Sequence, residues 1–336
     1  MPKDNLLDTT QNYPKGNSEG KIIPLKSFPD SRLTNETLEQ MGKYSSRVSV
    51  IMKKWYNSIR YKLYRQAFTS FKKVIPLKTR LALKKSMPVY VIQRIWKKDD
   101  VETWPVPANA HEQGLAKYEY SLFSQNGEDG ILRYLFGEIG YCSRFFVEIG
   151  FEVTECNSLR LMLKEKLSGL LIDGEERAVK KFNEAVRHMR INNVKAVARF
   201  LTADNLQTVI TSAGVPEEID LLSIDVDGND YWFWERIDFL NPRIVMVEYN
   251  ASLGPEVSLA VPYDPAFRRH QKHTSGFYCS ASLTAFNKLA EKKGYSLVGC
   301  DSSGVNAFFI RKDWITLNIR QLIPQEAFRP DQMRLN

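Results

Sequence analysis

The 336-residue sequence predicts an α/β fold with a mostly parallel, doubly wound sheet. From Tyr118 onward, short continuous apolar runs alternate with segments of helical periodicity, the pattern of strands that are buried on both faces and connected by helices. Five such strand–helix units precede a final pair of strands, so we expect seven strands. Apolar residues make up 43% of the chain and charged residues 26%, which excludes a disordered, collagen-like or disulfide-framework protein.

The first helix of this region is predicted to begin near Glu128 and Asp129, whose carboxylates favour a helix N-terminus. Ser124 or Asn126 is expected to cap it, and Gly140 is expected to end it.

The remaining elements follow in order. The predicted strands are compact apolar runs at residues 145–150, 170–173, 196–200, 219–225 and 244–249. The predicted helices have an apolar period and lie at residues 157–166, 175–189, 205–213, 231–237 and, after a long loop at 250–280, 283–293. Residues 295–300 and 306–311 are predicted to form an antiparallel pair at the sheet edge.

Charge divides the chain. Residues 1–41 have no hydrophobic period and are predicted to form a flexible tail. Residues 42–117 are predicted to form a basic amphipathic helical extension and linker, because residues 42–100 hold 16 basic and 2 acidic side chains. The α/β domain is assigned to residues 118–315 and a C-terminal tail to residues 316–336. The net charge of +8 therefore belongs to the extension.

In the extension, Ile51, Trp55, Ile59 and Leu63 recur every four residues between basic side chains. One interpretation is that this stripe packs on the α/β domain while the lysines face water. The other is peripheral contact of residues 42–100 with an anionic membrane surface or a polyanionic glycan carrier. Nucleic acid is not favoured as a partner, because no reader motif accompanies the charge.

The sequence predicts a cytoplasmic protein, with the extension as a peripheral contact at the inner membrane face. The four cysteines are widely scattered, which is typical of a reducing compartment. The first twenty residues are polar, and we find no run of about 18 apolar residues that could form a transmembrane helix.

Polar residues stand where the predicted strands end. Ligands of such sheets bind beyond the carboxyl ends of the strands, so these residues together predict a ligand site, although each alone could cap the helix that follows. They are Glu148, Asp173, Asp225, Asp227, Glu248 and Asn250.

The turn after the first predicted strand indicates the class of cofactor. Glu148 and Gly150 open this turn, and Asp173 at the end of the second strand is placed to bind both ribose hydroxyls of an adenosine cofactor. A dinucleotide would require G-x-G-x-x-G around its pyrophosphate, whereas this turn has one glycine and adds Glu152 and Glu155. S-adenosylmethionine carries no phosphate and therefore fits better.

The segment from Asp225 to Asp230 resembles a calcium loop but lacks its essential positions. Such a loop requires glycine at position six and glutamate at position twelve, where this chain has Asp230 and Arg236. No metal is favoured, and a looser Mg²⁺ site through Asp225 and Asp227 is the minor alternative.

Four segments together resemble the FkbM-like methyltransferase family over about residues 118–312. They read SQNGEDG from Ser124, FVEIG from Phe146, LSIDVDGNDYW from Leu222 and VEYN from Val247. The resemblance implies a Rossmann-like class I methyltransferase fold, S-adenosylmethionine as methyl donor, and cofactor contacts by Gln125, Glu148, Gly150, Asn157, Asp173 and Asp225. It also implies O-methylation of a sugar hydroxyl in a glycan, a glycolipid precursor or a glycosylated metabolite.

The chain departs from that family in the first turn, where Phe151–Thr154 replaces an expected Asp-Gly. Either the loop runs differently or cofactor affinity is reduced, because the missing glycine would allow close approach of the backbone. The alternative function is a catalytically degenerate methyltransferase-fold module for binding or assembly, docked through the basic extension.

A sugar hydroxyl benefits from a general base, for which Asp225 is the first choice and Asp227 or Glu248 the next. His270 and His273 in the long loop are further candidates, on a loop that could act as a lid. The alternative is that this loop is a solvated basic segment.

Overall fold

The computed structural model describes residues 88–97 and 114–331, which all belong to one compact unit, Ile75–Asn336. The flexible tail expected at residues 1–41 and most of the basic extension lie outside the described residues. Among the described residues, no helix is both long and apolar enough to cross a membrane.

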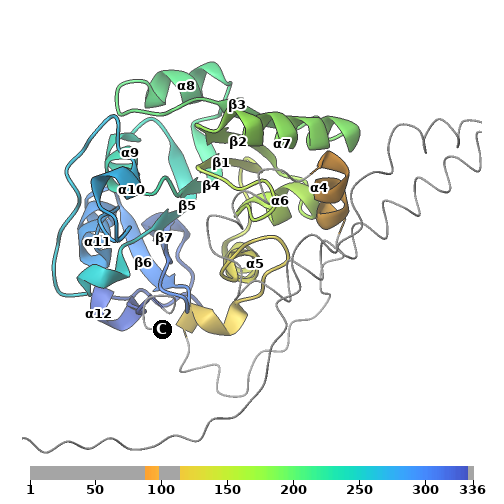
Figure 1. Cartoon of the computed structure of the whole chain (residues 1–336). Coiled ribbons are helices and arrows are strands. Elements are labelled where there is room, and N and C mark those ends of the chain that lie inside the picture. The colour runs from red at the N-terminus through yellow and green to blue at the C-terminus, as the bar shows by residue number, and fades with distance from the viewer. Residues whose placement is uncertain (1–87, 98–113, 332–336) are drawn as a thin grey trace, which may run out of the picture. The chain divides into compact units, whose positions relative to one another are not determined.

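The sheet has seven strands in the order β3-β2-β1-β4-β5-β7-β6 (Figure 1). The first five strands pair in parallel, whereas β7 lies antiparallel between β5 and β6. This is the Rossmann-like class I methyltransferase fold that the sequence predicts. The strands are β1 (Phe145–Ile149), β2 (Ser168–Asp173), β3 (Val194–Ala198), β4 (Glu218–Ile224), β5 (Asn241–Glu248), β6 (Tyr295–Cys300) and β7 (Asn306–Arg311).

Helices connect the strands and cover them. Helix α7 contacts β2 and β3, α9 contacts β4, and α11 contacts β6. The bounds of the domain's helices are α5 (Glu128–Ile139), α6 (Leu159–Leu163), α7 (Glu176–His188), α8 (Leu206–Ser212), α9 (Asp230–Arg236), α10 (Arg269–Lys272), α11 (Leu283–Lys292) and α12 (Pro324–Ala327). Short 3-10 turns are η3 (Gly114–Tyr118), η4 (Ala251–Leu253) and η5 (Lys312–Trp314).

The start of α5 uses one of the two residues that the sequence predicts as caps. The N-cap position itself is Gly127 with φ of 92°. The Ser124 hydroxyl oxygen accepts a 3.0 Å hydrogen bond from the first-turn amide of Asp129, and the Asp129 carboxylate accepts hydrogen bonds from the amides of Leu122, Phe123 and Ser124. Ser124 therefore caps the first turn from outside the N-cap position, whereas Asn126 does not. Gly140 does end the helix, as expected.

The core lies around the central strands, because parallel strands are covered on both faces. Trp234 of α9 is 1% exposed and packs its ring against Phe286 and Phe309. Apolar side chains of β1, β4 and β5 with 0% exposure are Phe146, Val147, Ile219, Leu221, Leu222, Ile244, Val245 and Val247.

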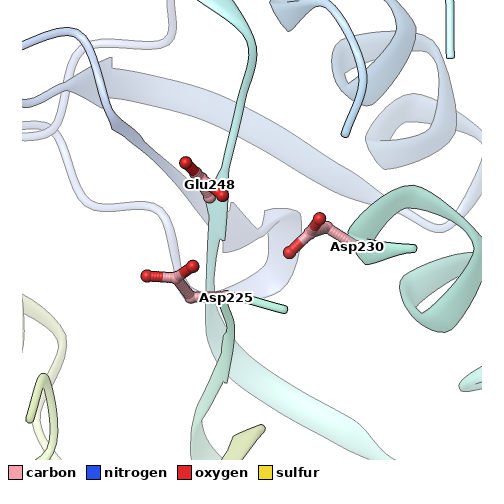
Figure 2. Close-up of side chains that lie close together, drawn as sticks. All are labelled: Asp225, Asp230 and Glu248. Carbon is pink, nitrogen blue, oxygen red and sulfur yellow. The ribbon is translucent and has the colours of Figure 1, made fainter. Parts of the chain in front are cut away.

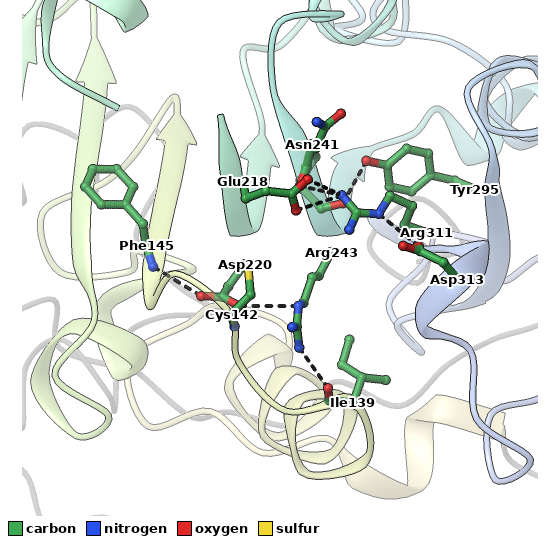
Figure 3. A network of polar contacts seen from close by, with 11 residues as sticks. Ile139, Cys142, Phe145, Glu218, Asp220, Asn241, Arg243, Tyr295, Arg311 and Asp313 are labelled. Carbon is green, nitrogen blue, oxygen red and sulfur yellow. Dashed lines mark hydrogen bonds and ion pairs between the residues drawn. The ribbon is translucent and has the colours of Figure 1, made fainter. Parts of the chain in front are cut away.

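A buried polar network lies at the amino ends of the strands (Figure 3). Asp220 of β4 accepts hydrogen bonds from the amides of Cys142 (2.6 Å) and Phe145 (3.2 Å) and lies 3.9 Å from Arg243 Nε. Arg243 of β5 donates to the carbonyl oxygen of Ile139 over 2.9 Å. These contacts join the α5–β1 connection to the middle of the sheet. Structural contacts therefore occupy the amino ends of the strands, and the candidate site lies at their carboxyl ends.

The helix α4 (Val89–Trp96) packs on the α/β domain, although the sequence places it in the extension. Trp96 is 1% exposed, and its Nε1 donates a 3.0 Å hydrogen bond to the carbonyl oxygen of Val153. Its ring also meets the edge of Phe182 in α7 at 5.1 Å between centroids. The end of the extension is thus tied to the turn that follows β1.

Candidate functional site

The turns that follow β1 and β4 touch each other backbone to backbone. Gly150 has φ of 81°, and a Cβ at this position would overlap the carbonyl oxygen of Asp225. The Asp225 amide donates to Ile149 over 2.9 Å, and the Gly150 amide donates to Ile172 over 2.8 Å. Only glycine accommodates both the dihedral angle and the contact.

Glu148 holds the chain between this turn and α6. It is 1% exposed and accepts hydrogen bonds from the amides of Asn157 and Ser158, each over 2.9 Å, and from the Ser158 hydroxyl. Cys156 Sγ also donates to it over 3.1 Å. Burial raises the pKa of Glu148, and these donors oppose that rise. Glu148 and Asn157 therefore shape the loop.

The Phe151–Thr154 turn takes a path that requires no second glycine. Gly150 is its one residue with positive φ, and a short antiparallel bridge joins Glu152 to Glu155. Phe151 and Val153 are 8% and 7% exposed, and Phe151 packs edge-on against Phe182. The turn after β1 is therefore built with Gly150 as its one glycine, and the effect of this turn on cofactor affinity stays a prediction.

A cavity of about 240 Å³ lies beside this turn, at the end of β2. Asp173 lies at its wall and accepts hydrogen bonds from the amides of Glu175 (2.6 Å) and Phe151 (3.3 Å), which fix the carboxylate. The other residues of the wall are Ile92, Phe151, Glu152, Val153, Thr154, Glu175, Arg177, Ala178 and Lys181. The cavity is smaller than the roughly 300–1,000 Å³ typical of ligand pockets, so it fits part of a cofactor, such as a nucleoside.

The predicted cofactor residues are not all at this cavity. Asp173 lines it, and Gly150 precedes the turn that lines it. Glu148 and Asn157 lie behind the turn, and Gln125 is an exposed residue that does not line the cavity.

Three carboxylates converge at the ends of β4 and β5 (Figure 2). Asp225 follows β4, Asp230 begins α9 and Glu248 ends β5, and each offers an oxygen within 4.8 Å of the others. Asp230 is fully buried and accepts hydrogen bonds from the amides of Val226 (2.8 Å) and Gly228 (2.9 Å). Asp225 is half-buried. We call Asp225, Asp230 and Glu248 the acidic cluster.

Burial and mutual repulsion raise the pKa values of the cluster. Burial, followed by Glu248, raises the pKa of Asp225 well above its ordinary value. The pKa of Glu248 rises to about 8, mainly by burial, then by Asp227 and Asp230, with Arg269 opposing. The pKa of Asp230 rises to about 6, also mainly by burial. Such carboxylates bind a proton or another cation more readily than ordinary ones.

Arg269 of α10 reaches this cluster from the long loop. Its Nη1 donates to Glu248 over 3.2 Å and to Asp227, and its Nε donates to the carbonyl oxygen of Gly276 over 2.6 Å. Asp227 is exposed and turned toward Arg269, outside the three-carboxylate group.

His270 and His273 are exposed, and His273 Nδ1 lies 2.6 Å from the Ser275 hydroxyl. Neither histidine contacts the acidic cluster in the described structure, so the loop brings in an arginine where histidine bases were expected. The sequence reasoning missed Arg269 and Asp230 as site residues. The signal for Asp230 was its place at the start of a helix directly after a strand, and no local pattern marks Arg269.

Two exposed aromatic side chains lie in the segment between α10 and α11, which is fixed to the end of β5. Phe277 and Tyr278 are 49% and 43% exposed. Their segment is fixed to the end of β5, because Asn250 Nδ2 donates to the Phe277 carbonyl oxygen and the Ser280 hydroxyl donates to that of Glu248. Exposed apolar groups gathered at a polar site are typical of a ligand-binding surface.

No family model matches the chain, and no curated protein matches it. Solved structures of methyltransferases are similar to it in part. An O-methyltransferase from Bacillus cereus in complex with SAH is 16% identical over 74% of this chain and 98% of that one, with a TM-score of 0.38. The SAH-bound magnesium protoporphyrin IX methyltransferase of Synechocystis PCC 6803 is 14% identical over 75% and 99%, with a TM-score of 0.37. The SAH-bound methyltransferase PaMTH1 of Podospora anserina is 12% identical over 71% and 99%, with a TM-score of 0.39.

Proposed function

We propose that this chain is an S-adenosylmethionine-dependent O-methyltransferase. The observation that carries the proposal is the arrangement of the two central turns: Asp173 stands at a nucleoside-sized cavity, and Gly150 joins that cavity to the end of β4. The cavity wall holds three acidic side chains, Glu152, Asp173 and Glu175, against the basic Arg177 and Lys181, and this small acidic excess suits a cofactor without phosphate.

The residues of the chain have distinct parts in this reaction. S-adenosylmethionine, when bound, supplies an electrophilic methyl group. Asp173 accepts hydrogen bonds from the ribose hydroxyls, and Glu148 keeps the turn in place. Because methyl transfer depends mainly on positioning, the chain has to hold the acceptor hydroxyl at the end of β4. Asp225, half-buried at that point, takes up the hydroxyl proton, and Glu248 lies next to it.

The proposed acceptor is a sugar hydroxyl of a glycan, a glycolipid precursor or a glycosylated metabolite, as the FkbM-like resemblance implies. The exposed rings of Phe277 and Tyr278 support a sugar, whose apolar face can pack on an aromatic ring beside the acidic cluster.

Calorimetric titration of the full chain with S-adenosylmethionine tests the cofactor assignment. Asp173→Asn is expected to weaken binding about tenfold or more, because it removes the charge from a carboxylate that accepts hydrogen bonds. The control is Asp238→Asn, which changes an exposed acid at the opposite edge of the sheet. Equal affinity in the two variants would remove Asp173 from the ribose site. Transfer of labelled methyl groups to a panel of nucleotide sugars and lipid-linked sugars then tests the acceptor.

The second candidate is a binding or assembly module that has lost catalysis. The closely packed Phe151–Thr154 turn favours it, since Phe151 and Val153 fill space with buried side chains and Trp96 fixes the Val153 carbonyl. Absence of binding at millimolar S-adenosylmethionine in the same titration supports the module, whereas saturable binding together with transfer of labelled methyl groups excludes it.

A further inference from the structure

The acidic cluster brings together hard oxygen ligands from three separate elements. Asp225 at the end of β4, Asp230 at the start of α9 and Glu248 at the end of β5 each offer an oxygen within 4.8 Å of the others (Figure 2). The parallel pairing of β4 with β5 creates this proximity, because it aligns the carboxyl ends of the two strands.

Negative charge at the cluster exceeds the positive charge that faces it. Of the charged groups that act most strongly on Glu248, Asp227 and Asp230 are acidic and Arg269 is basic. Asp227 is exposed and shares the same guanidinium, so part of the charge of Arg269 is taken by an acid outside the cluster. Buried carboxylates without a counter-charge are costly, and a divalent cation would remove that cost.

A second observation points to a ligand at this position. Glu248 is 8% exposed, and its Oε2 is buried with no hydrogen-bond partner among the described residues. Arg269 holds the other oxygen, Oε1. Buried acceptors are nearly always satisfied in proteins, so an orphaned carboxylate oxygen beside two other carboxylates indicates a missing cation.

The geometry points to a divalent cation site formed by Asp225, Asp230 and Glu248. An all-carboxylate donor set suits a hard ion such as Mg²⁺ or Mn²⁺. The backbone amides of Val226 and Gly228 fix the orientation of the Asp230 carboxylate. Glu248 contributes Oε2, the oxygen that does not bond to Arg269. The site differs from the Mg²⁺ alternative drawn from the sequence, since Asp230 and Glu248 replace Asp227.

The cation site shares Asp225 and Glu248 with the proposed methyl transfer, but it does not rest on that function, because the proposal here concerns only binding of the cation. When a cation is bound, Asp225 is a ligand and not a free base, and the cation adds its own charge to that end of the sheet.

Manganese titration tests the site in the full chain after treatment with EDTA and removal of the chelator. The loss of the electron paramagnetic resonance signal of free Mn²⁺ counts the bound ions. We expect one saturable site, whose affinity falls about tenfold or more in Glu248→Gln and in Asp225→Asn. Asp238→Asn is the control, since it changes an exposed acid that pairs with Lys293 and does not contact the acidic cluster, and it should change affinity less than about twofold.

A second readout does not depend on counting ions. Mn²⁺ should raise the thermal midpoint of the wild-type chain and of Asp238→Asn but not that of Glu248→Gln, because a ligand stabilises only a fold that binds it. Circular dichroism verifies that each variant is folded. Absence of saturable binding at millimolar Mn²⁺, or an equal loss of affinity in Asp238→Asn and Glu248→Gln, would overturn the proposal. A chain that binds Mn²⁺ but not S-adenosylmethionine retains the cation site and loses the proposed function.

Discussion

Gly150 is the residue at which the cofactor side and the acidic side of the site meet. Its φ of 81° disfavours any side chain, and its missing Cβ leaves room for the carbonyl oxygen of Asp225. Gly214 has a similar φ of 79°, but a Cβ added there would have no heavy atom of another residue within 4 Å beyond its chain neighbours. The pair therefore separates the cost of the dihedral angle from the cost of the close approach.

We predict that Gly214→Ala lowers the free energy of unfolding by about 1 kcal/mol, the cost of a left-handed alanine. Gly150→Ala should lose about 1–3 kcal/mol more, because the added methyl group forces the turns after β1 and β4 apart. Urea denaturation of both variants measures the difference. Equal losses would mean that the contact between Gly150 and Asp225 adds no constraint.

Glu128 gives a pH dependence at the residue scale. It is 1% exposed, and burial, followed by the nearby Asp301, raises its pKa to about 7 in the folded chain. The unfolded value is lower, so the stabilisation that the protonated group provides at low pH is lost as pH rises through 7.

We therefore predict that the free energy of unfolding falls between about pH 5 and pH 8, with up to ~3 kcal/mol due to Glu128. Glu128→Gln should show a shallower fall, and Glu138→Gln on the same helix should retain the wild-type slope. Urea denaturation at several pH values provides the comparison. The assignment fails if both variants follow the same slope.

At the scale of elements, α4 packs against the turn after β1 and stabilises it. Trp96 joins this helix to the Val153 carbonyl and to the ring of Phe182, and Ile92 contributes to the cavity wall. A helix encoded before residue 100 therefore helps to shape the candidate cofactor cavity.

Trp96→Ala is expected to cost about 3–5 kcal/mol of stability, as truncation of a buried tryptophan does. Trp96→Phe keeps an aromatic ring but leaves the Val153 carbonyl without its donor, so we expect a smaller loss of about 1–3 kcal/mol. Gln93→Ala, on a less buried position of the same helix, should stay within about 0.5 kcal/mol of wild type. If denaturant titration gives the same loss in free energy of unfolding for Trp96→Ala and Gln93→Ala, α4 does not stabilise the turn.

The strands and most helices were predictable because their signal is local. A strand covered on both faces must be continuously apolar, and residues 145–149 and 244–248 show this directly. The contact of Arg269 with Glu248 was not predictable, because it depends on the path of a loop between residues 250 and 280. The path of the chain before α5 was not predictable for a related reason: Ser124 and Asp129 each accept a hydrogen bond from the other's amide, and Asp129 also binds the amides of Leu122 and Phe123.

At the scale of the whole molecule, the chain divides into two compact units, Met1–Val74 and Ile75–Asn336, and α4 belongs to the second. Residues 42–87 carry 13 basic and no acidic side chains, and the described contacts involve residues 88–97 and 114–331. Truncation at residue 100, the limit of the basic segment, would delete α4 and expose the partners of Trp96. Truncation after residue 87 keeps them.

We predict that a variant lacking residues 1–87 retains its fold and its affinity for S-adenosylmethionine but loses salt-sensitive binding to phosphatidylserine-containing vesicles. Each basic side chain near an anionic surface contributes about 1 kcal/mol, so removal of this segment should have a large effect. Vesicle sedimentation measures it, with pure phosphatidylcholine vesicles as the control. If the truncated chain sediments as the full chain does, the basic segment has no part in membrane contact.

The single glycine of the β1 turn has a consequence for sequence divergence. Glu148 holds the loop at the amides of Asn157 and Ser158, and Trp96 holds it at the Val153 carbonyl. The half-buried Glu152 and Thr154 can therefore change without moving the chain, whereas Gly150 cannot. A sequence with such a turn can lack the glycine-rich motif that usually identifies the turn and still form it. Related sequences should then be recognised by a glycine matching Gly150 together with a segment matching Asp225–Asp230, rather than by a run of glycines.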